Sequence, residues 1–227
     1  MEKLLGLVHT TRLVVERSHA AITKELPDCK PVHLLDETLL MDFAETGGVN
    51  ARARRKLLAM VRSAEEAGAA MVLVTCSSLG DAVYEVQEFA DIPVLKIDEP
   101  MAEEVVRSAH TVGILATAPS AVAGTRDLVD RVAKRTGKEI QLRPFICADA
   151  GAHLARGMED FSRYLAEEAG KACRDVDALI VAQLSMCGLE DFIDQDIAGN
   201  IYTSLPYAVR KIKAMLDTVG TVSPALL

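Results

Sequence analysis

The pattern of apolar and polar positions divides the chain into short apolar runs that alternate with helical stretches. The clearest run, MVLVTCSSLG at 71–80, stays apolar and β-branched until it reaches a threonine, a cysteine, two serines and a glycine. Runs of this kind are typical of strands buried on both faces of a parallel sheet. The polar tail then falls at the carboxyl end of the strand, where open α/β sheets bind ligands. Cys76 is therefore the first candidate for a functional residue.

The second half of the chain repeats the plan of the first. TVGILAT at 111–117 resembles LLGLVHT at 4–10, and DALIVAQLS at 177–185 stands where AAMVLVTCS stood at 69–77. In both halves, apolar residues at helical spacing follow each apolar run. Alternating strands and helices imply right-handed crossovers and a parallel sheet.

We therefore predict an α/β protein of two similar lobes, each a mainly parallel sheet flanked by helices and related by a pseudo-two-fold axis. The expected boundaries are residues 1–98 for the first lobe and 99–205 for the second. A last helix within 206–227 could pack on either lobe, including back on the first. No low-complexity linker separates the lobes, which favours close apposition with the active site in the cleft between them.

Charge and cysteine content exclude several classes of protein. A formal net charge of -8 argues against a nucleic-acid-binding or anionic-membrane surface. The five cysteines are odd in number and share no C-x-x-C spacing, so they indicate neither a disulfide framework nor a zinc site. We expect a reduced, cytoplasmic setting. No apolar run is long enough to span a membrane, and the motifs of serine hydrolases, dinucleotide-binding folds and P-loops are absent from the sequence.

The surroundings of Cys76 suit a reactive thiol. Hydroxyl groups follow it directly, and the amino end of a helix comes next, so N–H donors and the helix dipole could stabilise a thiolate. A thiolate is both a nucleophile and a base. The alternative is that Cys76 packs as a small apolar residue, with Ser77 and Ser78 serving only the turn.

The order of several motifs resembles the aspartate/glutamate racemase superfamily, which includes hydantoin racemases, maleate isomerases and arylmalonate decarboxylases. The motifs are GLVHTT, VTCSSLG, IDEPM, VGILATAPS and ALIVAQLS, and together they cover nearly the whole chain. The resemblance implies thiol acid/base chemistry at the carbon next to a carboxylate, with no metal or cofactor. It also implies a small carboxylate-bearing substrate (an amino acid, a hydantoin or a dicarboxylate) and a homodimer or higher homo-oligomer.

By resemblance, backbone N–H groups and hydroxyls would bind the carboxylate of the substrate and stabilise the carbanion. The candidate hydroxyls follow the strands of both lobes: Thr10, Ser77, Ser78, Thr117 and Ser185. His9 could hydrogen-bond the substrate or serve as an auxiliary base, although a lone histidine at a strand end is often structural.

The sequence departs from the family pattern at the second base. Two-base racemases of the family place one cysteine at the strand end of each lobe, facing the substrate from opposite sides. An ungapped match puts Gln183 at the second position, and an amide cannot act as a general acid or base. Cys187 lies four residues later, where a short loop could bring its thiol to the cleft. Gln183 would then orient a carboxylate or amide, or bond only to backbone.

Two functions of different classes remain open. The first is a cofactor-independent racemase or isomerase, with a single-cysteine decarboxylase or isomerase as its variant if only Cys76 faces the substrate. The second is a non-catalytic protein that binds small carboxylates, which the glutamine at position 183 motivates.

Overall fold

The computed structural model describes residues 3–41 and 48–219 and contains two four-stranded sheets. Every strand pair in the described residues is parallel, and the strand orders are β2-β1-β3-β4 and β6-β5-β7-β8. The strands are β1 (Lys3–His9), β2 (Cys29–Leu35), β3 (Ala69–Val74), β4 (Val94–Lys96), β5 (Thr111–Ala116), β6 (Gln141–Ile146), β7 (Ala178–Val181) and β8 (Ile201–Tyr202). The predicted α/β fold with parallel sheets is confirmed, and the shared strand order is what an internal repeat would produce.

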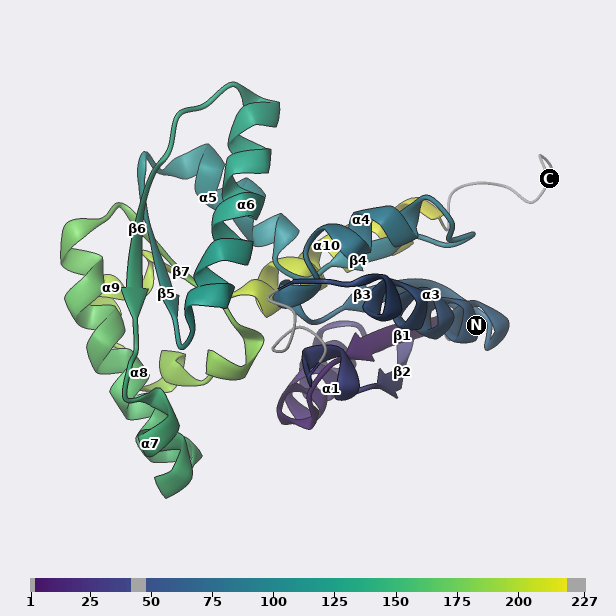
Figure 1. Cartoon of the computed structure of the whole chain (residues 1–227), viewed down its shortest axis with the longest axis horizontal. Helices are drawn as coiled ribbons and strands as arrows, with labels where there is room; N and C mark the ends of the chain where they lie inside the picture. Colours follow the sequence, from purple (N-terminus) through teal and green to yellow (C-terminus); the bar gives the residue numbers. More distant parts are fainter. Residues whose placement is uncertain (1–2, 42–47, 220–227) are drawn as a thin grey trace.

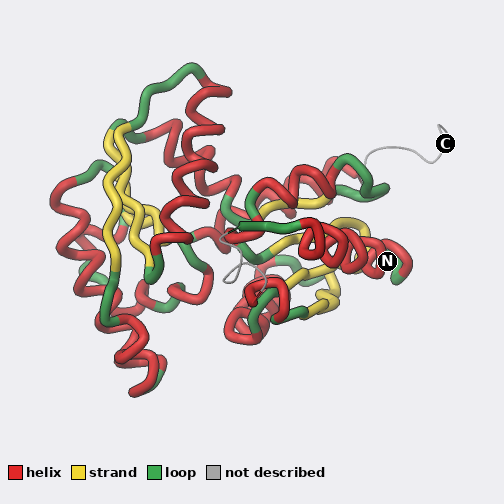
Figure 2. The backbone as a smooth tube through the Cα atoms, viewed as in Figure 1, coloured by secondary structure: helices red, strands yellow, loops and turns green. Residues whose placement is uncertain are grey.

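Helices flank both sheets, and the two sheets lie in separate halves of the molecule (Figure 1). The α-helices are α1 (Val15–Glu25), α3 (Ala51–Glu66), α4 (Asp81–Gln87), α5 (Glu99–Ser108), α6 (Pro119–Thr136), α7 (Ala150–Arg156), α8 (Met158–Ala172), α9 (Gln195–Ala198) and α10 (Ser204–Val219). Short 3-10 helices are η1 (Arg12–Val14), η2 (Ser77–Leu79), η3 (Cys173–Asp175), η4 (Leu184–Met186) and η5 (Leu189–Phe192). The tube view in Figure 2 shows the strands of each half enclosed by helices.

The first sheet is buried on both faces because alternate side chains of its central strands point to opposite sides. Leu7 and Leu73 belong to an apolar cluster with α1 and α10, which we call the α1–α10 cluster. Val72 and Val74 belong to a second cluster with α3 and α4, the α3–α4 cluster. The side chains of each central strand therefore contribute to two apolar clusters, one on each face of the sheet.

The last helix completes the core of the first half. Its residues Leu205, Val209 and Ile212 are buried in the α1–α10 cluster, and α10 runs back along the first sheet in Figure 1. The division of the chain at residues 98 and 99 stays a prediction.

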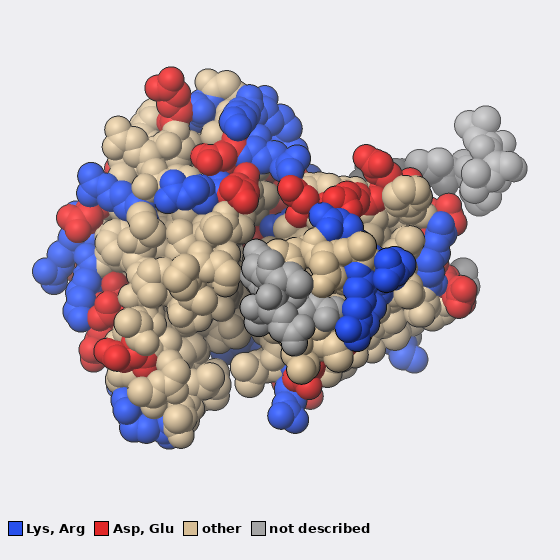
Figure 3. All heavy atoms as spheres, in the orientation of Figure 1, with Lys and Arg blue, Asp and Glu red and all other residues tan. Residues whose placement is uncertain are grey.

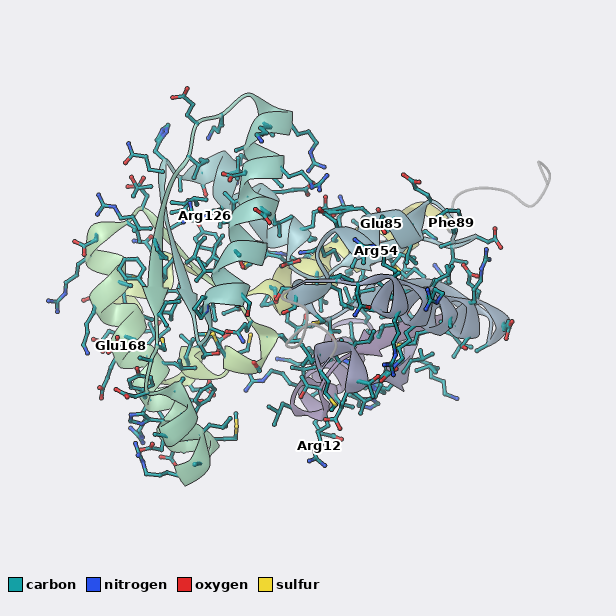
Figure 4. All side chains as sticks on the ribbon, viewed as in Figure 1. Arg12, Arg54, Glu85, Phe89, Arg126 and Glu168 are labelled. Carbon is teal, nitrogen blue, oxygen red and sulfur yellow. The ribbon has the colours of Figure 1, made fainter. Side chains whose placement is uncertain are left out.

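Ion pairs tie neighbouring helices of this half together. Arg54 of α3 and Glu85 of α4 point toward one another, with 2.6 Å between Nε and Oε2 (Figure 4). Both side chains are exposed, so this pair contributes little to the free energy of unfolding.

Two glycines at matching positions of the repeat allow close packing on the central strands. A Cβ at Gly6 of β1 would lie 2.9 Å from Ala64 Cβ of α3, and a Cβ at Gly113 of β5 would lie 2.6 Å from Leu179 Cδ1 of β7. Glycine at these positions therefore lets neighbouring elements approach the strand.

Candidate active site at the strand ends

Cys76 and Gln183 occupy matching places in the two halves. β3 ends at Val74 and β7 at Val181, and each strand therefore ends two residues before the residue in question. Cys76 and Gln183 are each the residue before a one-turn 3-10 helix, with extended backbone angles (φ -110°, ψ 111° and φ -129°, ψ 132°). The ungapped match that pairs these two residues in the sequence is therefore also a match of local backbone.

Donor groups around Cys76 favour its thiolate and act to lower its pKa. They are the Thr10 hydroxyl, the Ser78 hydroxyl and the backbone N–H groups of Ser78 and Leu79, the last of which also donates to the Cys76 carbonyl at 3.3 Å. Burial acts in the opposite direction and is the larger effect, so the pKa of the Cys76 thiol is raised. Burial therefore keeps the Cys76 thiol neutral, although the donor groups around it would stabilise the thiolate.

The second half repeats this arrangement with an amide in place of the thiol. Gln183 Oε1 accepts hydrogen bonds from the Thr117 backbone N–H and from the Thr117 hydroxyl, both at 2.9 Å. Thr117 matches Thr10 in the repeat. Because Oε1 is engaged, the NH₂ group of Gln183 is the part of the amide that can donate to a ligand.

The structure does not group Cys187 with these residues. Cys187 is buried among apolar side chains of the α1–α10 cluster, which includes Val14 and Leu184, whereas Cys76 belongs to the α3–α4 cluster. Burial, and secondarily the charge of Glu190, raises the pKa of the Cys187 thiol to about 12. These surroundings are those of a packed, neutral thiol.

His9 is fully buried at the end of β1, and both of its ring nitrogens have partners. Nδ1 lies 2.8 Å from Thr75 Oγ1, and Nε2 lies 2.9 Å from Nδ1 of His33. Burial, followed by the charge of His33, lowers the pKa of His9 to about 4. Both ring nitrogens of His9 therefore contact protein groups, and the predicted contact of His9 with the substrate stays a prediction.

The histidine contacts could not be predicted from the sequence, because they join β1, β2 and α1. His33 continues to His19 of α1, with 3.0 Å between Nε2 of His33 and Nδ1 of His19. In the described part of the chain, no group of three or more His, Cys, Asp or Glu side chains could hold a metal ion.

Two cavities lie beside the predicted site residues. One, of about 240 Å³, is lined by the hydroxyl-bearing residues Thr117 and Ser185 and by the apolar residues Leu13, Ala150, Gly151, Leu154, Met158 and Phe161. It combines Leu13 of the first half with strand-end residues of the second. α7, which contributes Leu154, is a helix that the sequence analysis missed because it is short and exposed.

The other cavity, of about 220 Å³, is lined by residues of η2, α4 and α6. Ser78, one of the donors to Cys76, lies on its wall together with Tyr84, Lys96 and Arg131. The predicted residues are therefore divided: Ser78 lines this cavity, and Thr117 and Ser185 line the other.

The fold and the strand-end residues define a class of two-lobed α/β proteins with polar groups at facing strand ends. Within that class, the profile of the Asp/Glu/Hydantoin racemase family matches residues 5–212. The chain belongs to this family, and the predicted recognition is confirmed. Family membership makes it an isomerase of the racemase type.

Solved structures of racemases share the fold. A glutamate racemase from Bacillus anthracis is 16% identical, with 99% of this chain and 85% of that chain covered and a TM-score of 0.70. An allantoin racemase from Klebsiella pneumoniae is 16% identical, with 95% and 88% covered and a TM-score of 0.69. An aspartate racemase from Picrophilus torridus is 12% identical, with 96% and 94% covered and a TM-score of 0.66. No curated protein sequence matches the chain at a significant level.

The surface carries charges of both signs. Lys and Arg side chains are interspersed with Asp and Glu on both halves of the face in Figure 3. Among the described helices, none has the length and apolar character needed to cross a membrane.

Proposed function

We propose that this protein is a cofactor-independent racemase or isomerase in which the Cys76 thiol moves a proton at the carbon next to a carboxylate. The observation that carries the proposal is the set of donor groups around Cys76 that favour its thiolate. Such donors lower the cost of the thiolate that must remove the proton. The family to which the chain belongs supports the same chemistry.

The proposed reaction moves one proton and two electrons at a time. The Cys76 thiolate removes the α-proton and becomes a thiol, and the C–H electron pair moves onto the carbon and is shared with the carboxylate oxygens. The Gln183 NH₂ group and the nearby hydroxyls, including Ser185, donate to those oxygens and stabilise the developing charge. Cys76 then returns the proton to the carbon, or water donates a proton to the opposite face and the hydroxide that remains takes the proton of the Cys76 thiol, which restores the thiolate.

Gln183 is proposed as the substrate-orienting group opposite Cys76, and Cys187 as a packing residue. The support for this assignment is that Gln183 has the backbone geometry of Cys76, whereas Cys187 is buried in the α1–α10 cluster. A single thiol suits exchange, isomerisation or decarboxylation, for which one acid/base group is sufficient.

The proposed substrate class follows the family. Cys76 and Gln183 are not among the described residues that line the cavity beside Thr117 and Ser185, so this cavity does not define the reacting part of the substrate. We propose a small carboxylate-bearing substrate such as an amino acid, a hydantoin or a dicarboxylate. A homodimer or higher homo-oligomer in the cytoplasm completes the proposal.

The test is hydrogen exchange in heavy water, followed by NMR of the α-proton. The panel contains amino acids with apolar side chains, hydantoins, aspartate, glutamate and substituted malonates. Cys76→Ala should lower the exchange rate by at least about 100-fold, the lower end of the effect of a general acid or base. Cys187→Ala is the matched control and should keep the rate of the natural protein.

Other outcomes assign the alternatives. Loss of exchange in folded Cys187→Ala as well as in Cys76→Ala would support the two-thiol mechanism. Exchange that survives Cys76→Ala would exclude the thiol mechanism. Binding of panel compounds without exchange or turnover would support the non-catalytic carboxylate-binding protein.

A further inference from the structure

Three histidines form a continuous chain of hydrogen bonds from the interior to the surface. His9 of β1 is fully buried, His33 of β2 is partly exposed, and His19 of α1 is exposed. The two links between ring nitrogens measure 2.9 Å and 3.0 Å. The rings of His9 and His33 are stacked, with centroids 5.1 Å apart, and the centroids of His33 and His19 lie 5.3 Å apart.

The hydrogen bonds at the buried end set the direction of the chain. The single hydroxyl proton of Thr75 is donated to the Val8 carbonyl at 3.0 Å, so Thr75 Oγ1 accepts from Nδ1–H of His9. Nε2 of His9 then accepts from Nδ1–H of His33, and Nε2 of His33 accepts from Nδ1–H of His19. All three neutral rings carry their proton on Nδ1, and the open acceptor is Nε2 of His19 at the surface.

We propose that His9, His33 and His19 form a proton relay between bulk water and the buried strand end beside Cys76. A proton from water binds Nε2 of His19, and the Nδ1 proton of His19 moves to Nε2 of His33. The Nδ1 proton of His33 then moves to Nε2 of His9. One proton has entered at the surface and one positive charge has reached His9, while His19 and His33 are neutral again but now carry their proton on Nε2. The reverse sequence returns a proton to water and restores Nδ1–H on both rings.

The position of the relay links it to the proposed chemistry of Cys76. His9 is bonded to Thr75, the chain neighbour of Cys76, and it is itself the chain neighbour of Thr10, which donates to the Cys76 sulfur. A positive charge at His9 would stabilise a thiolate at Cys76, because opposite charges interact strongly where water is excluded. This link to catalysis rests on the proposed function of Cys76, whereas the relay itself does not.

Charged groups around the relay affect how readily its histidines take up a proton. The pKa of His33 is lowered by burial and by the charge of His19, and Glu16 of α1 acts in the opposite direction. Asp36, after β2, donates its backbone N–H to the His9 carbonyl, while its carboxylate pairs with Lys56 of α3 at 3.2 Å. His9 and His33 are thus neutral at rest, as a relay requires, and Glu16 favours entry of a proton.

The test needs no substrate. In protein labelled with ¹⁵N-histidine, NMR reports which nitrogen of each ring carries the proton, and ¹⁵N relaxation dispersion near the pKa of His9 reports how fast its Nε2 gains and loses a proton. We expect Nδ1–H on all three neutral rings. His33→Gln keeps a donor for Nε2 of His9 but cannot release its amide proton, so it should slow the protonation of Nε2 of His9 at least about tenfold.

Two further variants keep the result decisive. His19→Gln alters only an exposed side chain, so it should fold, and it should slow the same protonation of His9 by removing the entry point. His110→Gln, at an exposed histidine outside the chain of three, should change nothing. Protonation of Nε2 of His9 at the natural rate in both relay variants, or Nε2–H on neutral His9, would overturn the relay while leaving the proposed racemase chemistry of Cys76 untouched.

Discussion

The Ser77 hydroxyl donates to the Ala182 carbonyl at 3.1 Å, and this hydrogen bond joins the strand ends of the two halves. Ser77 follows Cys76 in the chain, and Ala182 precedes Gln183. The bond therefore joins the chain neighbours of the two residues that occupy matching positions in the repeat. It spans two sheets that share no strand pairing in the described residues. The hydrogen bond from Ser77 to Ala182 therefore holds the Cys76 thiol and the Gln183 amide at a fixed separation.

Loss of the Ser77 hydroxyl should loosen this contact without changing the thiol. Ser77→Ala removes one hydrogen bond, which should lower the free energy of unfolding by about 0.5–1.5 kcal/mol. Ser78→Ala is the matched neighbour: its hydroxyl donates to Cys76, so its loss should raise the pKa of Cys76 further. Urea unfolding and the pH dependence of Cys76 alkylation measure the two effects. If both variants changed the free energy of unfolding and the pH dependence of Cys76 alkylation by equal amounts, the distinct roles assigned to the Ser77 and Ser78 hydroxyls would be wrong.

The repeat could be predicted from the sequence, because the order and spacing of residues within each short segment can be compared directly. LLGLVHT and TVGILAT keep their glycine and their final threonine in register, and this was enough to match Thr10 with Thr117. Gln183 follows Thr117 by as many residues as Cys76 follows Thr10, and the backbone around Cys76 and Gln183 agrees with that match. The parallel sheets followed from the alternation of apolar runs with helical stretches.

Contacts between distant segments could not be predicted in this way. The packing of Cys187 depends on α1 and α10, which come from opposite ends of the chain. The link from His9 to His33 depends on the register of β1 against β2, in which Leu7 and not His9 is the partner of His33. Neither arrangement leaves a local pattern in the sequence.

A second thiol in the place of Gln183 should change the stereochemical course of the reaction. Gln183→Cys would put a thiol before η4, where Thr117 can donate to its anion as Thr10 does to Cys76. We expect the variant to convert one enantiomer of an exchanged substrate into both, measured by chiral chromatography beside NMR exchange. Its KM should rise because the amide no longer binds the carboxylate.

The control for this variant is Gln183→Ser, which is small and polar but cannot serve as an acid or base near neutral pH. It should exchange the proton but form the second enantiomer no faster than the natural protein does. Racemisation by Gln183→Ser at the rate of Gln183→Cys would show that the added thiol is not the second base.

The buried ion pair at the end of β4 should be costly to break from one side. Lys96 and Asp98 are 1% and 3% exposed at their side chains, and Lys96 Nζ donates to Asp98 Oδ1. Asp98→Asn removes the charge that balances Lys96, so the free energy of unfolding should fall by about 3–5 kcal/mol. Lys96→Met combined with Asp98→Asn leaves no unbalanced charge and should recover much of that loss. Urea unfolding measures both; a double variant as unstable as Asp98→Asn would contradict the electrostatic cause.

Acid should unfold the protein partly through His9. Its pKa is about 4 in the folded chain, against 6.5 for an unperturbed histidine, because burial and then the charge of His33 disfavour the imidazolium. Between these values the unfolded chain binds a proton that the folded chain does not, so the free energy of unfolding falls as the pH falls. The full difference from 6.5 to about 4 corresponds to about 3 kcal/mol, all of it present above pH 6.5. The lowered pKa of His33 acts in the same direction.

His9→Asn isolates this contribution, because asparagine can donate to Thr75 but does not titrate. Urea unfolding at constant ionic strength, from neutral pH down to about 4, should show a smaller loss of stability for His9→Asn than for the natural protein. Carboxylates titrate equally in both, so the difference between the two curves is the measured quantity. His110→Asn should follow the natural protein, since its side chain is exposed. Parallel curves for His9→Asn and the natural protein would mean that His9 takes up its proton as easily when folded as when unfolded, and burial would then not be what keeps the ring neutral.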